Sequence, residues 1–218
     1  MKSREFHRLF NKLLSQLLIP HGFTNSGSKK ATFHRQTDGE VYHIIVPWLV
    51  GRGGQWFDIK VLATSPLVDL SFSKSFPDNL GMPHDRLTGL ELHGMVNSAN
   101  HVFRGNKPEG LIRNFNNQAK PAIVEHAIPY LDKIQTLKDL RSNINPAGKS
   151  MSYGLCLWHT GEKRKAKKIL LAVKKDAQAN LSQYLSIETV PQRDQSNHDL
   201  SVEHLKSVIG YIDELLLR

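Results

Sequence analysis

The chain has 218 residues, of which 39% are hydrophobic and 22% are charged. These proportions are those of an ordinary globular protein, and they exclude a disordered chain, which lacks the apolar residues to build a core. The 29 lysine and arginine residues outnumber the 20 acidic ones and give a formal net charge of +9. This charge favours acidic partners, whether nucleic acid, an anionic membrane surface or an acidic protein.

Two further features concern location and redox chemistry. No apolar run approaches the roughly 20 residues that cross a bilayer, so membrane insertion is not expected. Residues 1–8 lack the apolar segment of a secretory signal, and we expect a cytoplasmic protein. Cys156 is the single cysteine, so no internal disulfide can form. Its apolar neighbours Leu155 and Leu157 predict a buried thiol.

The first predicted element is an amphipathic helix from about Arg4 to Leu18. Apolar residues recur there at the i, i+3, i+4, i+7 spacing that places them on one helix face. They are Phe6, Leu9, Phe10, Leu13, Leu14, Leu17 and Leu18. We expect Ser3 to cap the N-terminus of this helix, and Pro20 and Gly22 to end it.

A sheet is predicted next, as an antiparallel meander of three to four strands or more. Residues 31–36 and 41–49 form the first two strands, and a glycine-rich turn at 51–54 leads to a third strand at 56–64. Apolar residues alternate along this third segment, as in a half-buried strand. Residues 87–96 are predicted to form a fourth strand.

The turn between the first two strands predicts their register. Asp38-Gly39 is a pair that takes the positive φ angles of a two-residue type I′ turn. With this pair at the tip, Arg35 lies opposite Tyr42, and His34 lies opposite His43.

The next part of the chain is predicted to be mostly helical. Residues 65–86 show no clear periodicity and are expected to form a long connection. A helical region follows from about Pro108 to Gln135, in which Pro121 and Pro129 mark helix starts or kinks. Thr136 is expected to cap a short helix that ends at Asn143.

The segment Pro146-Ala147-Gly148 is the predicted domain boundary. It separates an α+β core domain, residues 1–145, from an all-helical C-terminal extension, residues 146–218, that we expect to pack on the core. This extension comprises a helical hairpin around Thr160-Gly161 and a final helix from about Ser201 to Leu217. The predicted fold class is therefore α+β, an antiparallel sheet packed with helices and followed by a helical extension.

The densest group of charges lies on the second helix of this hairpin, opposite its apolar stripe. The group comprises Lys163, Arg164, Lys165, Lys167, Lys168, Lys174 and Lys175. Cations on one helix face can contact successive phosphates or an acidic protein surface. The alternative is a solvated helix face, since no aromatic residues that would stack on bases alternate with these cations.

A second candidate site follows from the predicted hairpin register. If the third strand pairs with matching parity, one sheet face carries His34, His43, Trp56, Asp58 and Lys60. Two imidazoles with a carboxylate can bind a metal or transfer protons, but a structural zinc site needs four ligands and a catalytic one usually three. The alternative is a pair of histidines that form local hydrogen bonds, and we predict no metal and no cofactor.

No sequence motif indicates an enzyme class. The helical His-Glu-x-x-His zinc motif, the phosphate-binding Gly-x-x-x-x-Gly-Lys-Ser/Thr loop and the Gly-x-Ser-x-Gly nucleophile turn are all absent from the sequence.

The order of several short segments resembles a known family. A leucine-rich helix ending in Pro20-His21-Gly22-Phe23 precedes Phe33-His34-Arg35 and a strand from Tyr42 to Val46. Further segments are Trp56-Phe57-Asp58-Ile59, Ala127-Ile128-Pro129-Tyr130-Leu131 and Thr136-Leu137-Lys138-Asp139-Leu140. Over about the first two-thirds of the chain, they resemble the bacterial domain of unknown function 4304 family.

This resemblance implies an α+β domain with a curved antiparallel sheet, and it carries over no catalytic residue. Some small bacterial families of this kind look like immunity or accessory proteins encoded beside toxins, which implies protein binding.

Three hypotheses about function follow. The first is a non-enzymatic binding protein whose helix Lys163–Lys175 contacts an acidic protein partner. The second is binding of RNA or DNA phosphates by the same helix, with little sequence discrimination. The third is a small hydrolase or metal-dependent enzyme at His34, His43 and Asp58.

Overall fold

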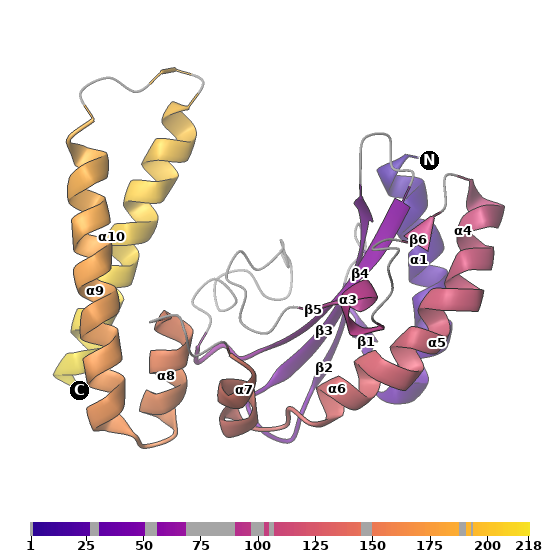
Figure 1. Ribbon diagram of the computed structural model, residues 1–218, viewed down its shortest axis with the longest axis horizontal. Helices are drawn as coiled ribbons and strands as arrows, with labels where there is room; N and C mark the ends of the chain where they lie inside the picture. Colours follow the sequence, from indigo (N-terminus) through magenta and orange to yellow (C-terminus); the bar gives the residue numbers. More distant parts are fainter. Residues whose placement is uncertain are drawn as a thin grey trace. The chain divides into compact units, whose positions relative to one another are not determined.

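A computed structural model describes residues 2–26, 31–50, 56–68, 90–96, 103–104, 107–144, 150–187, 191–192 and 194–218. The chain divides into two compact units, Met1–Ile144 (unit 1) and Asn145–Arg218 (unit 2). Unit 1 contains an antiparallel meander with helices, and unit 2 is mostly helical (Figure 1). The predicted α+β fold class is therefore confirmed.

Helix α1 spans Ser3–Leu18 and buries one side completely. The side chains that are 0% exposed are Phe6, Phe10, Leu14 and Leu18. The predicted cap is wrong by one residue. The first helical hydrogen bond runs from the backbone N–H of Phe6 to the carbonyl oxygen of Lys2, so Lys2 is the cap residue and Ser3 is the first residue of the helix. The side chain of Lys2 makes no capping hydrogen bond. The helix ends, as predicted, through a short 3-10 turn, η1 (Ile19–His21). Gly22 follows with a φ of 80°, which glycine adopts without strain.

Six strands are present in the described part of unit 1. They are β1 (Thr24–Asn25), β2 (Phe33–Gln36), β3 (Tyr42–Val50), β4 (Trp56–Thr64), β5 (Leu90–Glu91) and β6 (Phe103–Arg104). Strands β1 to β5 follow one another in chain order, all neighbours are antiparallel, and β6 also pairs with β4. The predicted turn at 51–54 and most of the connection at 65–86 lie outside the described residues.

The predicted fourth strand, residues 87–96, is wrong over most of its described part, residues 90–96. Within the described residues, only Leu90–Glu91 is extended, and helix α3 (Leu92–Met95) follows directly. The apolar residues Leu92, Met95 and Val96 also fit the i, i+3, i+4 spacing of a helix, so the short pattern was ambiguous.

The β2–β3 hairpin has a three-residue connection instead of the predicted two-residue turn. The backbone N–H of Thr37 donates to the carbonyl of Val41 at 3.0 Å, and Arg35 lies opposite His43. The predicted register was therefore wrong by one residue. Thr37 Oγ1 stabilises the longer connection by one local and one long-range bond: it accepts a hydrogen bond from the N–H of Gly39 at 3.2 Å and donates one to the carbonyl of Gln135 at 3.0 Å.

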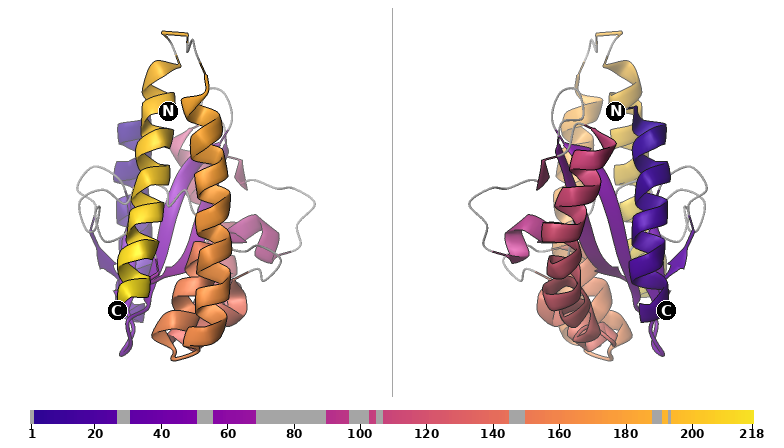
Figure 2. Two further views of the ribbon diagram at one scale, coloured as in Figure 1. Left: turned by 90° about the vertical axis from the view of Figure 1, so that its left-hand side faces the viewer. Right: turned by 90° about the vertical axis from the view of Figure 1, so that its right-hand side faces the viewer.

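The helices of unit 1 cover one face of this sheet. Several large apolar side chains of this face are 0% exposed, and they are Phe33, Ile45, Phe57, Ile59 and Val61. The ring of Phe10 on α1 lies 5.0 Å from that of Phe57 and 5.7 Å from that of Phe115. Helix α1 and the helix of residues 108–132 therefore lie side by side over the sheet (Figure 2).

The helix of residues 108–132 is continuous but changes its pitch. The α-helical segments α4 (Pro108–Asn114), α5 (Lys120–Ala122) and α6 (Ile128–Asp132) alternate with two π-helical segments, η2 (Phe115–Ala119) and η3 (Ile123–Ala127). Segment η2 precedes Pro121 and segment η3 precedes Pro129, the two prolines that were predicted to mark helix starts or kinks. Because proline has no N–H to donate and its ring crowds the preceding turn, a wider turn accommodates it. Pro121 and Pro129 thus mark changes of helix type.

The last helix of unit 1 begins where the sequence predicts it. Helix α7 spans Leu137–Asn143, and Thr136 caps it. The backbone N–H of Asp139 donates to Thr136 Oγ1 at 3.3 Å, and the backbone N–H of Thr136 donates to Asp139 Oδ2 at 2.9 Å. This reciprocal capping box satisfies two N–H groups that the first turn leaves without helical partners.

Unit 2 consists of α8 (Met151–His159), α9 (Lys163–Leu185) and α10 (Gln195–Leu217) in its described residues. The predicted hairpin of α8 and α9 is confirmed, with Gly161 at a φ of 88° in the turn. The final helix begins earlier than predicted, and Ser201 lies inside it, where its hydroxyl donates to the carbonyl of Asn197 at 2.8 Å. No helix in the described ranges is long and apolar enough to cross a membrane.

Two helix glycines of unit 2 should respond oppositely to substitution. A Cβ atom on Gly154 would lie 2.8 Å from Leu170 Cδ2, whereas one on Gly210 would meet nothing within 4 Å. Gly154→Val should therefore destabilise the protein by about 1–3 kcal/mol through overpacking, and Gly210→Ala should stabilise it by about 0.5–1 kcal/mol. Urea denaturation followed by circular dichroism measures both changes, and a Gly154→Val variant as stable as wild type would contradict the close packing of α8 on α9.

Candidate functional site

The basic segment at the start of α9 is not explained by helix stability. Lys163, Arg164 and Lys165 occupy the first turn, where the helix dipole is positive and a cation typically costs about 0.3–1 kcal/mol. Two local contacts offset part of this cost. Lys165 Nζ lies 2.7 Å from Glu162 Oε2, and Lys163 Nζ lies 3.7 Å from the ring centroid of Trp158.

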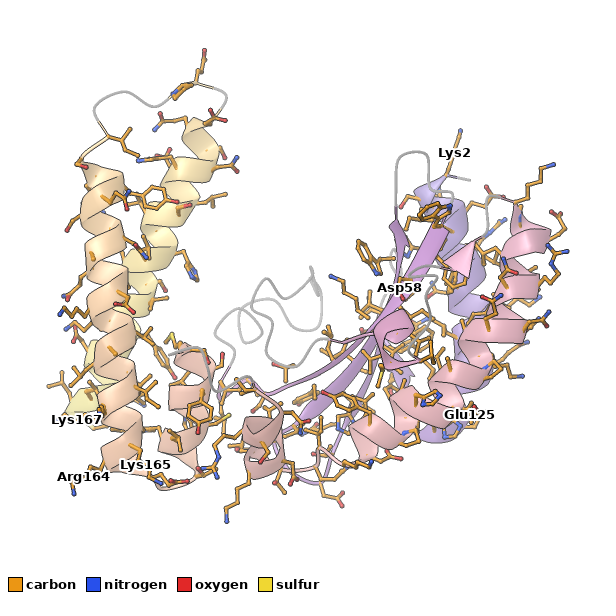
Figure 3. All side chains as sticks on the ribbon, in the orientation of Figure 1. Lys2, Asp58, Glu125, Arg164, Lys165 and Lys167 are labelled. Carbon is orange, nitrogen blue, oxygen red and sulfur yellow. The ribbon has the colours of Figure 1, made fainter. Side chains whose placement is uncertain are left out.

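All seven predicted cations lie on α9, as expected, but they differ in what they contact. Ala166, Leu170 and Ala177 form the buried side of the helix. Lys174 is half-buried and forms an ion pair with Asp213 on α10. The other six are exposed, and among the described residues four of these six have no ion-pair or hydrogen-bond partner: Arg164, Lys167, Lys168 and Lys175. Arg164 and Lys167 extend away from the axis of α9 in Figure 3.

A continuous row runs along the exposed side of α9. Arg164, Lys168, Leu171 and Lys175 follow one another at i, i+4, i+7 and i+11, so they share one helix face and extend over about 16 Å. Leu171 is 45% exposed in the middle of this row. We call these four residues the α9 row. It presents three cations around one apolar side chain.

The predicted sheet-face site is only partly assembled. His34, Trp56, Asp58 and Lys60 share one face of the sheet, whereas His43 lies on the opposite face. The expectation that His34 and His43 face each other is therefore wrong, because the three-residue connection shifts the register by one residue and so reverses the face of every following side chain.

The remaining members of that site do not converge. His34 pairs with Ile44 of β3, whereas Asp58 pairs with Trp48, which lies four residues after Ile44 on the same strand. This difference corresponds to about 13 Å along the strand direction. No group of three or more metal-binding side chains occurs in the part of the chain that the structure describes. The geometry thus gives the hydrolase or metal-enzyme hypothesis no assembled site.

Residues of this sheet face make local contacts instead. Asp58, which Figure 3 labels, is 1% exposed and accepts a hydrogen bond from the backbone N–H of Ile59 at 2.7 Å. Lys60 Nζ lies 4.7 Å from the ring centroid of Trp48. Trp56 is 41% exposed at the end of β4. The two charged residues of this face, Asp58 and Lys60, thus both have contacts within the sheet.

The register places a buried histidine in a polar cluster that sequence patterns do not reveal. Arg35 Nη2 lies 2.5 Å from Asp132 Oδ1 and 2.9 Å from His43 Nδ1. His43 Nε2 lies 2.7 Å from the carbonyl oxygen of Ile134. Since that carbonyl only accepts and the guanidinium only donates, His43 is neutral with its proton on Nε2. We call Arg35, His43 and Asp132 the Arg35 cluster. Asp132 is 97 residues from Arg35, so no local pattern connects them.

The Arg35 cluster also reaches the end of α1. Arg35 Nη1 donates to the carbonyl of His21 at 3.2 Å, and its guanidinium carbon lies 4.7 Å from the ring centroid of Phe23. The cluster therefore joins the end of α1, strands β2 and β3, and the end of α6. Its geometry is that of a structural contact, since every polar atom described here already has a partner within the fold.

Comparisons with known proteins add no relative. No family model, no curated protein and no solved structure matches the chain. The fold defines an α+β protein with a helical C-terminal region, and the resemblance to the domain of unknown function 4304 family stays a prediction.

The Arg35 cluster predicts how stability depends on pH. Burial lowers the pKa of His43, and burial also lowers that of His34. In the unfolded chain a histidine titrates near its ordinary value of about 6.5. Below that pH the unfolded state binds protons that the folded state does not, so the stability that is complete above about 6.5 is lost as the pH falls.

His43→Gln should reduce this pH dependence, because its side-chain amide can donate to Ile134 and accept from Arg35 without titrating. Urea denaturation of both proteins at about pH 7.5 and about pH 5.5 measures the difference. The matched control, exposed His126→Gln, should retain the wild-type loss. An equal loss of stability in the His43 variant would contradict the neutral, buried imidazole.

Proposed function

We propose that the protein is a non-enzymatic binding protein whose α9 row contacts an acidic helical surface of a protein partner. The observation that carries this proposal is Leu171, which is 45% exposed between Lys168 and Lys175. An amphipathic partner helix that presents carboxylates around an apolar side chain matches both properties of the row. Phosphates match only the cations.

The same observation separates the proposal from nucleic-acid binding. Surfaces that bind nucleic acid without sequence preference combine cations with exposed aromatic rings on which bases stack. No aromatic residue lies between the cations of the row in the sequence, and the ring of Trp158, which precedes α9, already contacts Lys163. An exposed leucine contributes nothing to a phosphate contact, whereas burial of a leucine stabilises a protein interface by up to about 1.5–3 kcal/mol.

The energetics indicate a moderate, salt-dependent interaction. An exposed ion pair typically contributes about 0.2–1 kcal/mol, so three cations by themselves give little affinity. Their main effect is on the association rate and on the choice of partner, since like-charged surfaces repel. Apolar contact around Leu171 therefore has to add to the affinity, whereas reversing two of the cations replaces attraction with repulsion.

The test uses a defined probe, a labelled helical peptide with glutamates and a leucine at i, i+4, i+7 and i+11, which mirrors the α9 row. Fluorescence anisotropy should show binding that Lys168→Glu with Lys175→Glu abolishes and that Leu171→Ser weakens about tenfold, the loss of roughly 1.4 kcal/mol of apolar contact. Raising the salt concentration should weaken binding to the wild-type protein.

The matched control is Arg4→Glu with Arg8→Glu on the exposed side of α1, which changes the net charge of +9 by the same amount. This control should bind the peptide with little loss. Random-sequence DNA and RNA are titrated in parallel. Tighter binding to nucleic acid with a steep salt slope and no effect of Leu171→Ser would overturn the proposal in favour of phosphate contact.

A further inference from the structure

The helical hairpin of α9 and α10 has its basic and acidic residues in different segments. Residues 163–175 carry seven basic and no acidic side chains. Residues 176–205, which include the connection between the helices, carry five acidic side chains and one arginine. The hairpin therefore has a strongly positive segment and a negative one.

These two segments do not lie beside each other in one molecule. The helices are antiparallel, so residues 163–175 pack against the C-terminal half of α10, where Lys174 pairs with Asp213. At the other end of the hairpin, His198 Nε2 lies 3.0 Å from the carbonyl oxygen of Tyr184. The two sides of this end of the hairpin both belong to the acidic segment, so the positive and negative segments do not neutralise each other within one molecule.

The acidic segment presents a row that complements the α9 row. Asp199, Leu200 and Glu203 are exposed on the N-terminal half of α10, and Leu200 is 60% exposed. We call these three residues the α10 row. It carries the opposite charge to the α9 row: Asp199 lies one residue before the exposed Leu200, and Glu203 lies three residues after it.

The acidic end of the hairpin also lacks a core of its own. Between residues 178 and 207, no described side chain is buried. The buried apolar residues of the hairpin all lie nearer its other end, and they are Ala166, Leu170, Ala177, Val208, Ile212 and Leu215. An amphipathic helix pair is stabilised mainly by burial of its apolar side chains, so this end gains stability when a further surface covers it.

We infer that the acidic surface bound by the α9 row is the α10 row of a second copy of this chain. This inference rests on the proposed function and names its partner. A two-fold axis perpendicular to the hairpin brings the positive end of each copy to the negative end of the other, and both contacts form at once. In this arrangement α9 runs parallel to α10 of the second copy. Leu171 then packs near Leu200 of the second copy, with Lys175 near Glu203.

Charge reversal in both rows tests this inference. Sedimentation velocity of the full-length protein should show a dimer that dissociates on dilution and at high salt. Lys168→Glu with Lys175→Glu, and separately Asp199→Lys with Glu203→Lys, should each weaken dimerisation by at least about tenfold, because like charges then face each other. An equimolar mixture of the two variants should dimerise again, since both contact sites of the mixed dimer pair opposite charges, one of them with the signs exchanged.

The control Arg4→Glu with Arg8→Glu should dimerise like wild type, and circular dichroism should show that every variant is folded. A wild-type protein that stays monomeric at all concentrations overturns the inference, as does a mixture that remains monomeric. If the wild type is monomeric yet binds the acidic peptide through the α9 row, the proposed function stands and only the second copy is wrong. If it is monomeric and the peptide does not bind, both proposals fail.

Discussion

The register of the β2–β3 hairpin is the constraint on which the rest of unit 1 depends. Successive side chains of a strand point to opposite faces, so a change of one residue exchanges the two faces along the whole strand. With Thr37 opposite Val41, Phe33 and Ile45 face the helices and form the core. The same register brings Arg35 and His43 together on the helix-covered face.

The Arg35 cluster shows how a polar group can be placed in that face without destabilising it. Burying an unpaired charge or imidazole costs several kcal/mol, on the order of the whole net stability of a domain. Here the guanidinium group meets a carboxylate, an imidazole nitrogen and a backbone carbonyl from three other segments. The contact therefore joins η1, which follows α1, and the end of α6 to the sheet.

Unit 2 distributes its charges differently. Cations in the first turn of α9 oppose the helix dipole, and acidic residues gather at the other end of the hairpin. Neither feature stabilises the isolated hairpin, and both produce surfaces that attract opposite charge. A sequence that departs from local stability rules on one exposed face, while it keeps a regular buried stripe, is typical of a surface selected for binding.

The sequence by itself determined the elements whose signals are local. The apolar stripes of α1 and α9, the alternation along β4 and the helix cap at Thr136 each lie within a few turns or strand residues, so their spacing predicted them correctly. It also located the cations of the α9 row. Only the tertiary structure decided the hairpin register, because Thr37 bonds to Gln135, far along the chain. The separation of His34 from His43 follows from that register, and the Arg35 cluster also needs Asp132, which lies 97 residues from Arg35.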